Sequence, residues 1–321
     1  MRVEVDEHAG FCAGVARAIA LAEKSLAAGQ LLSIGPIIHN PLEVARLERR
    51  GLHTVAQERV EGSDPESLPA RRVLVRSHGI SEALRTSLES AGLELIDGTC
   101  PIVCKVQQLV KSYCAQGYRV VIFGKKDHPE VRGLVGHCPQ GAVVVGSVEE
   151  AQQLGPSEEP TVLVAQTTAP ESVFTQVADV LQQRIPALKV HDTTCRSVRR
   201  REKSIAVFAQ AHEVLVFVGG KESSNSRQLF SICQQHNRRS FWIEGPQEVR
   251  AEWFAAVGSV GVTGGASTPY WLLRQVADII EHIARSGGHK NHIKEVVLND
   301  GRRSNPGVRT GRRSQKRNGR R

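Results

Sequence analysis

Three cysteines of this chain occupy equivalent positions in three copies of one α/β unit, and this repeat restricts the fold more than any other feature. Cys12, Cys100 and Cys195 each follow a short strand-like run and each open a helical stretch. They are 88 and 95 residues apart, about the length of one small α/β unit. Backbone N–H groups and the helix dipole at such a turn are expected to lower the pKa of a thiol.

Two polar turns follow each cysteine at matched distances. The first turns lie 27 or 28 residues after the cysteine, at His39-Asn40, His128-Pro129-Glu130 and Ser223-Ser224-Asn225. The second turns lie 66 to 72 residues after it, at Ser77-His78-Gly79, Gln166-Thr167-Thr168 and Gly265-Ala266-Ser267. Ligand groups gather at the carboxyl ends of parallel strands. Three such units around a pseudo-threefold axis would therefore bring three thiols and many polar side chains into one site.

Short apolar runs alternate with helical stretches along the chain, which is typical of parallel strands buried on both faces. The clearest runs are 73–75, 120–123, 162–164 and 214–218, and helices are expected near 41–50, 81–91 and 268–285. The predicted fold class is α/β, a trefoil of three pseudo-threefold-related units with small parallel sheets and right-handed crossovers. We expect the units at 13–98, 99–192 and 193–290, with the N-terminal strand region 1–12 joining the third.

The net charge of +9 comes from the C-terminal segment. Residues 302–321 hold nine of the 42 lysines and arginines and no acid, which leaves 33 basic against 33 acidic residues in the rest. This composition predicts a disordered basic tail. A weak, salt-dependent contact with nucleic acid or an acidic protein is one interpretation of the tail, and a solubilising segment is the simpler one.

The remaining composition favours an enzyme of the cytoplasm. No apolar run of about 18 residues and no secretory signal is found, so no membrane span is expected. The seven cysteines do not have the spacing of a secreted disulfide framework, which favours a reducing compartment. Four of them lack the threefold relation and are expected to be packing or surface thiols: Cys104, Cys114, Cys138 and Cys233.

Three thiolates are one ligand short of a closed metal site. Soft thiolate ligands favour zinc or an iron–sulfur cluster. Three protein ligands on a [4Fe–4S] cluster leave one iron open, and an open iron is a Lewis acid for a substrate oxygen. The alternative is that three buried cysteines at equivalent turns hold no ligand at all.

The chain resembles the 4-hydroxy-3-methylbut-2-enyl diphosphate reductases, which carry out the last step of the methylerythritol phosphate pathway of isoprenoid biosynthesis. The similarity runs in family order over roughly residues 1–285. Its motifs are Gly10-Phe11-Cys12-Ala13-Gly14-Val15, His39-Asn40, Ser77-His78-Gly79, Thr99-Cys100-Pro101, His128-Pro129-Glu130-Val131, Gln166-Thr167-Thr168, Ser223-Ser224-Asn225-Ser226 and Gly264-Gly265-Ala266-Ser267.

The resemblance implies a trefoil around a central [4Fe–4S] cluster held by Cys12, Cys100 and Cys195. It also implies two-electron removal of the substrate C4 hydroxyl, which gives isopentenyl and dimethylallyl diphosphates, with ferredoxin or flavodoxin as electron donor. Glu130, with His128 and Thr167, is expected to supply and orient the proton. Burial is expected to raise the pKa of Glu130. The expected diphosphate-binding residues are His39, His78, His128, Thr167, Ser223, Ser224, Asn225 and Ser267.

The chain departs from the family pattern near two of the cysteines. Val198 and Glu202 replace a threonine and a glutamine after Cys195, within a run of arginines. Cys104 and Gln107 stand where Thr-like and His residues are common after Cys100. The arginine run predicts either an exposed helix face or a docking surface for an acidic electron donor. A second hypothesis is therefore a non-catalytic iron–sulfur paralogue, a redox sensor whose basic tail binds nucleic acid.

Overall fold

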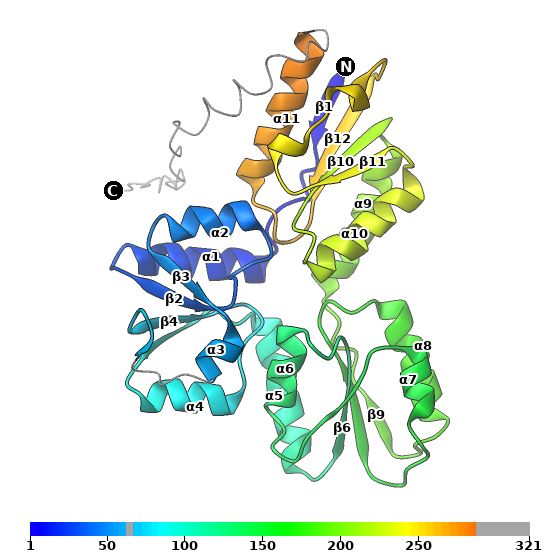
Figure 1. Cartoon of the computed structure of the whole chain (residues 1–321). Coiled ribbons are helices and arrows are strands. Elements are labelled where there is room, and N and C mark those ends of the chain that lie inside the picture. Colours follow the sequence, from blue (N-terminus) through cyan, green and yellow to red (C-terminus); the bar gives the residue numbers. More distant parts are fainter. Residues whose placement is uncertain (62–66, 287–321) are drawn as a thin grey trace, which may run out of the picture.

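Three small parallel sheets surround the centre of the molecule (Figure 1). The structure, a computed structural model, describes residues 1–61 and 67–286. The predicted basic tail at 302–321 and the last residues of the third predicted unit lie outside these ranges. The α/β trefoil predicted from the sequence is confirmed. None of the described helices is long and apolar enough to cross a membrane.

The three sheets have the same internal order. In each, the first strand of the unit lies between the second and the third, and the strand that leads into the next cysteine forms one edge. The sheets are β3 (Leu52–Val55), β2 (Leu31–Ile34), β4 (Arg72–Val75), β5 (Glu94–Asp97); β7 (Val143–Val145), β6 (Arg119–Phe123), β8 (Thr161–Ala165), β9 (Leu188–Val190); and β11 (Ser240–Ile243), β10 (Val214–Val218), β12 (Ser259–Gly264), β1 (Arg2–Val5).

The first strand of the chain belongs to the last sheet. Val3 of β1 lies opposite Val260 of β12, and Val5 lies opposite Val262, in parallel register. Thus β1 enters Cys12 from the edge of the third sheet, just as β5 and β9 enter Cys100 and Cys195 from the first and second sheets. The chain therefore closes into a ring of three units.

Helices connect the strands and cover the sheets. Many of them begin at a residue whose side chain accepts a backbone N–H of the first turn, as at Asn40, Ser81, Ser147 and Ser223. The helices are α1 (Ala13–Leu26), α2 (Pro41–Glu48), α3 (Gln57–Glu61), α4 (Glu82–Ser90), α5 (Pro101–Ala115), α6 (Pro129–Val135), α7 (Val148–Gln153), α8 (Glu171–Gln182), α9 (Arg196–Gln210), α10 (Ser224–His236) and α11 (Tyr270–Arg285), with short 3-10 turns η2 (Pro246–Glu248) and η3 (Ala251–Phe254).

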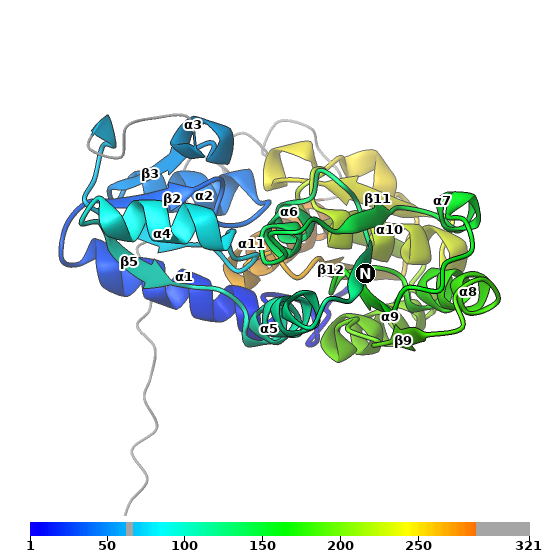
Figure 2. The same cartoon turned by 90° about the horizontal axis from the view of Figure 1, so that it is seen from below.

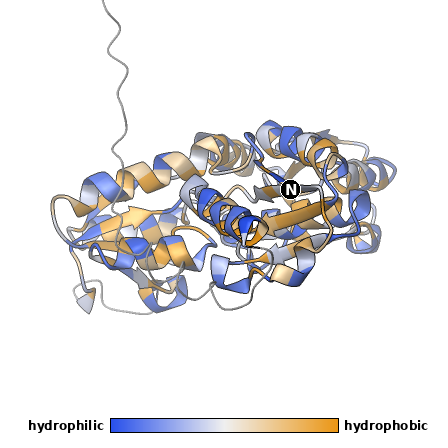
Figure 3. Ribbon diagram, turned by 90° about the horizontal axis from the view of Figure 1, so that it is seen from above, coloured by the Kyte–Doolittle hydropathy of each residue, from blue (hydrophilic) through white to orange (hydrophobic). Residues whose placement is uncertain are grey.

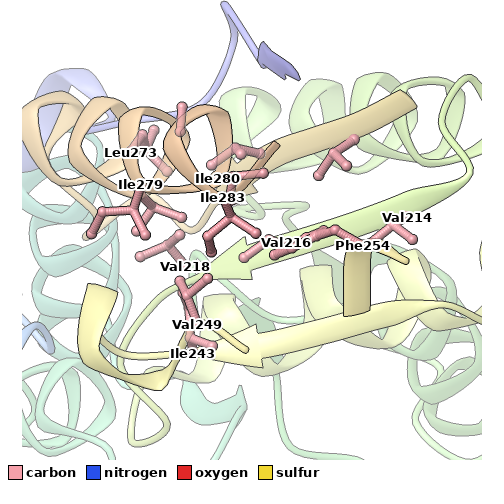
Figure 4. Packing of buried hydrophobic residues seen from close by; sticks show 14 of the residues in the cluster. Val214, Val216, Val218, Ile243, Val249, Phe254, Leu273, Ile279, Ile280 and Ile283 are labelled. Atoms are coloured by element: carbon pink, nitrogen blue, oxygen red, sulfur yellow. The ribbon is translucent and has the colours of Figure 1, made fainter. Parts of the chain in front are cut away.

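Each sheet has apolar side chains on both faces, as the continuous apolar runs predict. The strands are among the most hydrophobic segments of the molecule (Figure 3). In the third unit, Leu273, Ile280 and Ile283 of α11 pack on one face of the sheet, in the same core as Val216 and Val218 of β10 (Figure 4). These cores fix the strand ends, and therefore the polar turns that follow them.

One prediction about the cysteines is wrong. Cys114 and Cys138 form a disulfide, whereas both were expected to be packing or surface thiols. They are buried in the core between α5 and the turn after α6, and 24 residues separate them. Sequence spacing carried no signal for the pair because the contact depends on how α6 packs against α5. Cys233 is buried and unpaired, as expected.

An aspartate lies at or just after the end of each strand that leads to one of the three cysteines, and each aspartate forms an ion pair with an arginine. Asp6 pairs with Arg201 at 2.7 Å, Asp97 with Arg85 at 2.7 Å and Asp192 with Arg199 at 3.2 Å. The Asp6 pair is almost fully buried, and Thr263 of β12 donates to the same carboxylate at 2.8 Å. This cluster joins the start of the chain to α9 and β12.

We predict that Asp6→Asn lowers the free energy of unfolding by about 3–5 kcal/mol, because it leaves the buried Arg201 guanidinium without its counter-charge. Urea unfolding measures the effect. Asp278→Asn is the control, since Asp278 is half-exposed in its pair with Arg274 and its loss is expected to cost at most about 1 kcal/mol. Equal costs for the two variants would contradict the structural role of the Asp6 cluster.

Candidate functional site

The three predicted cysteines line one central cavity. Each is the N-cap residue of a helix, Cys12 of α1, Cys100 of α5 and Cys195 of α9, and no thiol caps its own helix. Each cysteine N–H donates to a carbonyl oxygen of the second polar turn of the preceding unit. The acceptors are Ala266, at 3.3 Å from Cys12, Ser77, at 3.0 Å from Cys100, and Thr167, at 2.7 Å from Cys195. The site is thus assembled from the junctions between the units.

Helix α1 passes close to the sulfur of Cys100. A Cβ atom added at Gly14 would lie 2.7 Å from the Cys100 sulfur, so a glycine is needed for α1 to pass this close. Burial raises the pKa of Cys12, with smaller contributions from Cys100 and Cys195, so the prediction of a lowered pKa is wrong for Cys12. Desolvation outweighs the backbone N–H groups there, and a metal would have to displace the proton.

The donor set of the cavity, three free thiols, is of the kind that holds zinc or an iron–sulfur cluster. Across residues 1–61 and 67–286, no group of three His, Cys, Asp or Glu side chains is arranged to hold one metal ion. A cluster of several irons needs thiols that surround a larger space, one from each side. Three free thiols around one cavity meet that requirement, and the cavity wall contributes no fourth cysteine.

Glu130 also lines the cavity, at the start of α6. Its side chain is 1 % exposed, and Thr167 holds both oxygens: the backbone N–H donates to Oε1 at 2.6 Å and the hydroxyl to Oε2 at 2.9 Å. Burial raises the pKa of Glu130 to about 7 despite these two hydrogen bonds. The prediction of a raised pKa is confirmed, and the carboxyl group exists in both protonation states near neutral pH.

Three histidine rings form a row beside Glu130. The ring centroids of His39 and His78 are 5.9 Å apart, and those of His78 and His128 are 5.2 Å apart. Burial lowers the pKa of all three, that of His128 to about 4, so the rings are neutral at pH 7. His128 Nδ1 accepts the Glu130 backbone N–H at 3.2 Å, which caps α6 and leaves the proton on Nε2.

Arg76 is a functional candidate that the sequence analysis missed. It is 4 % exposed, packs over Gly35, and donates to the Pro36 carbonyl at 3.3 Å. Its positive charge contributes to the lowered pKa of His39, His78 and His128. Burial lowers the pKa of Arg76 itself to about 10, so it remains charged at pH 7. The feature of the sequence that could have identified Arg76 is its position directly before the polar turn Ser77-His78-Gly79.

The third unit supplies hydroxyl and amide groups from the other side of the cavity. Ser223 caps α10 by accepting the Ser226 N–H, and Asn225 Oδ1 accepts the Ala266 N–H at 3.0 Å. Two buried polar atoms of the cavity wall, His78 Nδ1 and Ser267 Oγ, have no hydrogen-bond partner among the described residues. Unsatisfied buried polar atoms at a cavity indicate that a polar ligand completes them.

Ten of the twelve predicted site residues line the cavity, and two do not. His128 lies behind His78, and Ser224 faces the neighbouring cavity between the second and third units, where Lys125 Nζ donates to it at 3.4 Å. Neither position was visible in the sequence, because adjacent residues of a helix start point in different directions. The cavity encloses about 740 Å³ of empty space, its open mouth included.

Apolar side chains complete the wall, and the sequence analysis expected only one of them, Val198, to face the pocket. Val198 is on the wall, as inferred from its replacement of a pocket threonine; the others are Val15, Ile37, Ile38, Ile102 and Val103. The other residues that depart from the family pattern do not line the cavity. Cys104 is half-buried one turn along α5, Gln107 packs on Gly79, and Glu202 accepts from Gln228.

The chain is similar to one enzyme family over nearly all of its described length. A family described as LytB protein matches residues 3–281. The 4-hydroxy-3-methylbut-2-enyl diphosphate reductase of Caldanaerobacter subterraneus is 38% identical, over 88% of this chain and 98% of its own, and that of Aquifex aeolicus is 38% identical, over 87% and 96%. The enzyme of the same name from Helicobacter pylori is 35% identical, over 88% and 100%.

Two solved structures have the same fold. One, described as the (E)-4-hydroxy-3-methyl-but-2-enyl diphosphate reductase, the terminal enzyme of the non-mevalonate pathway, is 37% identical with a TM-score of 0.66, and covers 88% of this chain and 100% of its own. The other, a reductase from Plasmodium falciparum, is 23% identical with a TM-score of 0.76, over 86% and 87%, and supports the fold alone.

We predict that Gly220→Ala weakens binding of inorganic diphosphate at the cavity. An added Cβ atom would overlap the His39 carbonyl oxygen and push the first and third units apart. Overpacking of this kind also costs about 1–3 kcal/mol of stability. Calorimetric titration and urea unfolding measure the two effects. Gly155→Ala is the control because nothing lies within 4 Å of its added Cβ. Unchanged binding in Gly220→Ala would contradict a site shared between these units.

Proposed function

Because the chain belongs to the LytB protein family, we propose that it is a reductase that converts 4-hydroxy-3-methylbut-2-enyl diphosphate to isopentenyl and dimethylallyl diphosphates. In this reaction two electrons and two protons break the C4–O bond, form one C–H bond at either end of the allylic unit and release water. The observation that carries the proposal is the joint placement of three free thiols, a titratable buried carboxyl group and unsatisfied polar atoms around one cavity.

Cys12, Cys100 and Cys195 are proposed to hold a [4Fe–4S] cluster. Bound there, the cluster would supply the electrons and a Lewis-acidic iron without a protein ligand. The chain's own contribution is to fix the backbones of the three cysteines to the neighbouring units, so that their thiols line one cavity.

The diphosphate is proposed to lie between the histidine row and the third unit. Ser223, Asn225 and Ser267 offer donors from one side, and His39 and His78 from the other. The rings are neutral before binding, and the buried charge of Arg76 supplies a fixed positive potential behind them. Ser224 accepts a hydrogen bond from Lys125 in the neighbouring cavity and would have to turn away from it to reach the ligand. His128 does not line the cavity, and it is proposed to position Glu130 and His78, both of which it contacts.

Glu130 is proposed to be the proton source. Its protonated form donates to the leaving hydroxyl group, and Thr167 holds the carboxyl oxygens in place during the transfer. The apolar wall formed by Val15, Ile37 and Ile38 excludes water around the hydrocarbon part of the substrate. Reducing equivalents are proposed to come from ferredoxin or flavodoxin, and the cytoplasm remains the predicted compartment.

Anaerobic turnover tests the proposed function. Protein reconstituted with iron and sulfide is given 4-hydroxy-3-methylbut-2-enyl diphosphate and reduced methyl viologen, and both isoprenoid diphosphates are followed. We expect rapid formation of both products. Protein that holds a cluster but forms neither product would contradict the proposal and favour the non-catalytic redox sensor.

We predict that Glu130→Gln reduces kcat by about 10²–10⁴-fold, because the amide cannot deliver a proton. Diphosphate binding and the cluster absorbance are expected to be unchanged, since the amide keeps the volume of the carboxyl group. Glu150→Gln on the surface is the control and retains full turnover. Wild-type kcat in Glu130→Gln would remove Glu130 from the mechanism.

A pH dependence follows from the pKa of Glu130, about 7. Since the protonated form is the donor, kcat/KM is expected to fall as pH rises through about 7, and this fall should be absent from the residual activity of Glu130→Gln. The same raised pKa makes the wild type lose stability as pH rises from the ordinary glutamate pKa of 4.5 to about 7, because in this window the unfolded state ionises while the buried carboxyl group stays protonated. Glu130→Gln should therefore be more stable than the wild type at pH 8 but not at pH 4, as measured by urea unfolding.

A further inference from the structure

The helices that begin at the three cysteines share an unusual charge pattern. None of α1, α5 and α9 has an acidic residue in its first turn, although acids are favoured at that position by the helix dipole. Four exposed cations lie within about two turns of the cysteines instead: Arg17, Lys105, Arg196 and Arg200. The three helices lie on one side of the flat molecule, opposite α3 and α6 (Figure 2).

These cations are available to a partner. Lys105, Arg196 and Arg200 make no ion pair or hydrogen bond within the described residues, and Arg17 donates only to the Thr99 carbonyl, at 3.1 Å. Small or apolar exposed residues lie in the first turns of two of the same helices: Ala13, Pro101 and Ile102, the last of which also lines the cavity. An apolar centre with a charged rim is the usual composition of a protein interface.

The acidic residues nearest to these helix starts are already neutralised. Arg85 pairs with Asp97, while Arg199 pairs with both Asp192 and Glu171. Glu202, in the second turn of α9, is half-buried and accepts from Gln228. The arginine run after Cys195 is therefore divided: Arg199 and Arg201 have structural partners, and Arg196 and Arg200 face solvent.

We propose that this face, formed by the first turns of α1, α5 and α9, is the docking surface for a small acidic electron-carrier protein. The inference rests on the proposed reductase function, which requires electrons to enter beside the three cysteines. A carrier with a negative surface would be steered to the four cations and would seat over Ala13, Pro101 and Ile102. The occupant is a protein rather than a small anion because the cations are spread over three helices.

The test separates carrier docking from catalysis by changing only exposed charges. In the reconstituted protein, Lys105→Glu/Arg200→Glu is compared with wild type and with Lys24→Glu, a control at the far, exposed end of α1. Turnover is driven either by reduced flavodoxin or by reduced methyl viologen. Binding of oxidised flavodoxin to each protein is measured separately by calorimetry.

We expect the double variant to lose about 10- to 100-fold in kcat/KM for flavodoxin at low ionic strength, and the deficit to shrink as salt is added. Flavodoxin binding should weaken in parallel, whereas viologen-driven turnover and Lys24→Glu should match wild type. If the double variant turns over with viologen and its flavodoxin kinetics and binding are unchanged, the docking proposal is wrong, while the proposed reductase function still holds. Loss of binding to a 20-nucleotide RNA, with flavodoxin kinetics intact, would assign the face to nucleic acid. No viologen-driven turnover in any protein would instead contradict the reductase function.

Discussion

Three backbone hydrogen bonds, one at each junction between units, fix the geometry on which the site depends. Each runs from a cysteine N–H to the second polar turn of the preceding unit. Thr167 shows the consequence, because its carbonyl oxygen holds Cys195 while its N–H and hydroxyl hold Glu130. A shift of one unit would therefore move a proposed metal ligand and the proposed proton source together. Since β1 completes the third sheet, the ring of junctions is also closed.

The electrostatics of the cavity follow from burial rather than from ion pairs. Burial holds the three histidines neutral and raises the pKa of Glu130 to about 7, while Arg76 stays charged behind them. Neutral donors and one fixed buried charge can receive a diphosphate without first breaking strong ion pairs. A carboxyl group with a pKa near neutrality can deliver a proton and recover it from solvent between turnovers.

Much of this arrangement could be predicted from the sequence because it is repeated. Matched offsets identified Cys12, Cys100 and Cys195, and the polar turns that hold His39, Glu130 and Ser223, since parallel units place equivalent residues at equivalent strand ends. The Cys114–Cys138 disulfide has no equivalent in the other units and depends on helix packing. Arg76 was missed because its burial and its contact with the Gly35 turn are tertiary. The predicted direction of the Cys12 pKa shift was wrong for the same reason. Local backbone N–H groups lower the pKa of the thiol, but burial, which depends on the tertiary structure, raises it by more.

Iron and sulfide content of the three single Cys→Ser variants tests most directly whether one cluster joins the three units. Anaerobically reconstituted Cys12→Ser, Cys100→Ser and Cys195→Ser are compared with wild type and with Cys233→Ser, whose thiol is buried in a separate core. The convergent arrangement predicts about four irons and four sulfides per chain in wild type and in Cys233→Ser, as for a [4Fe–4S] cluster. Each of the other three variants should lose cluster absorbance and most of its iron. Full iron content with an unchanged spectrum in any one of them would contradict a cluster held by all three units.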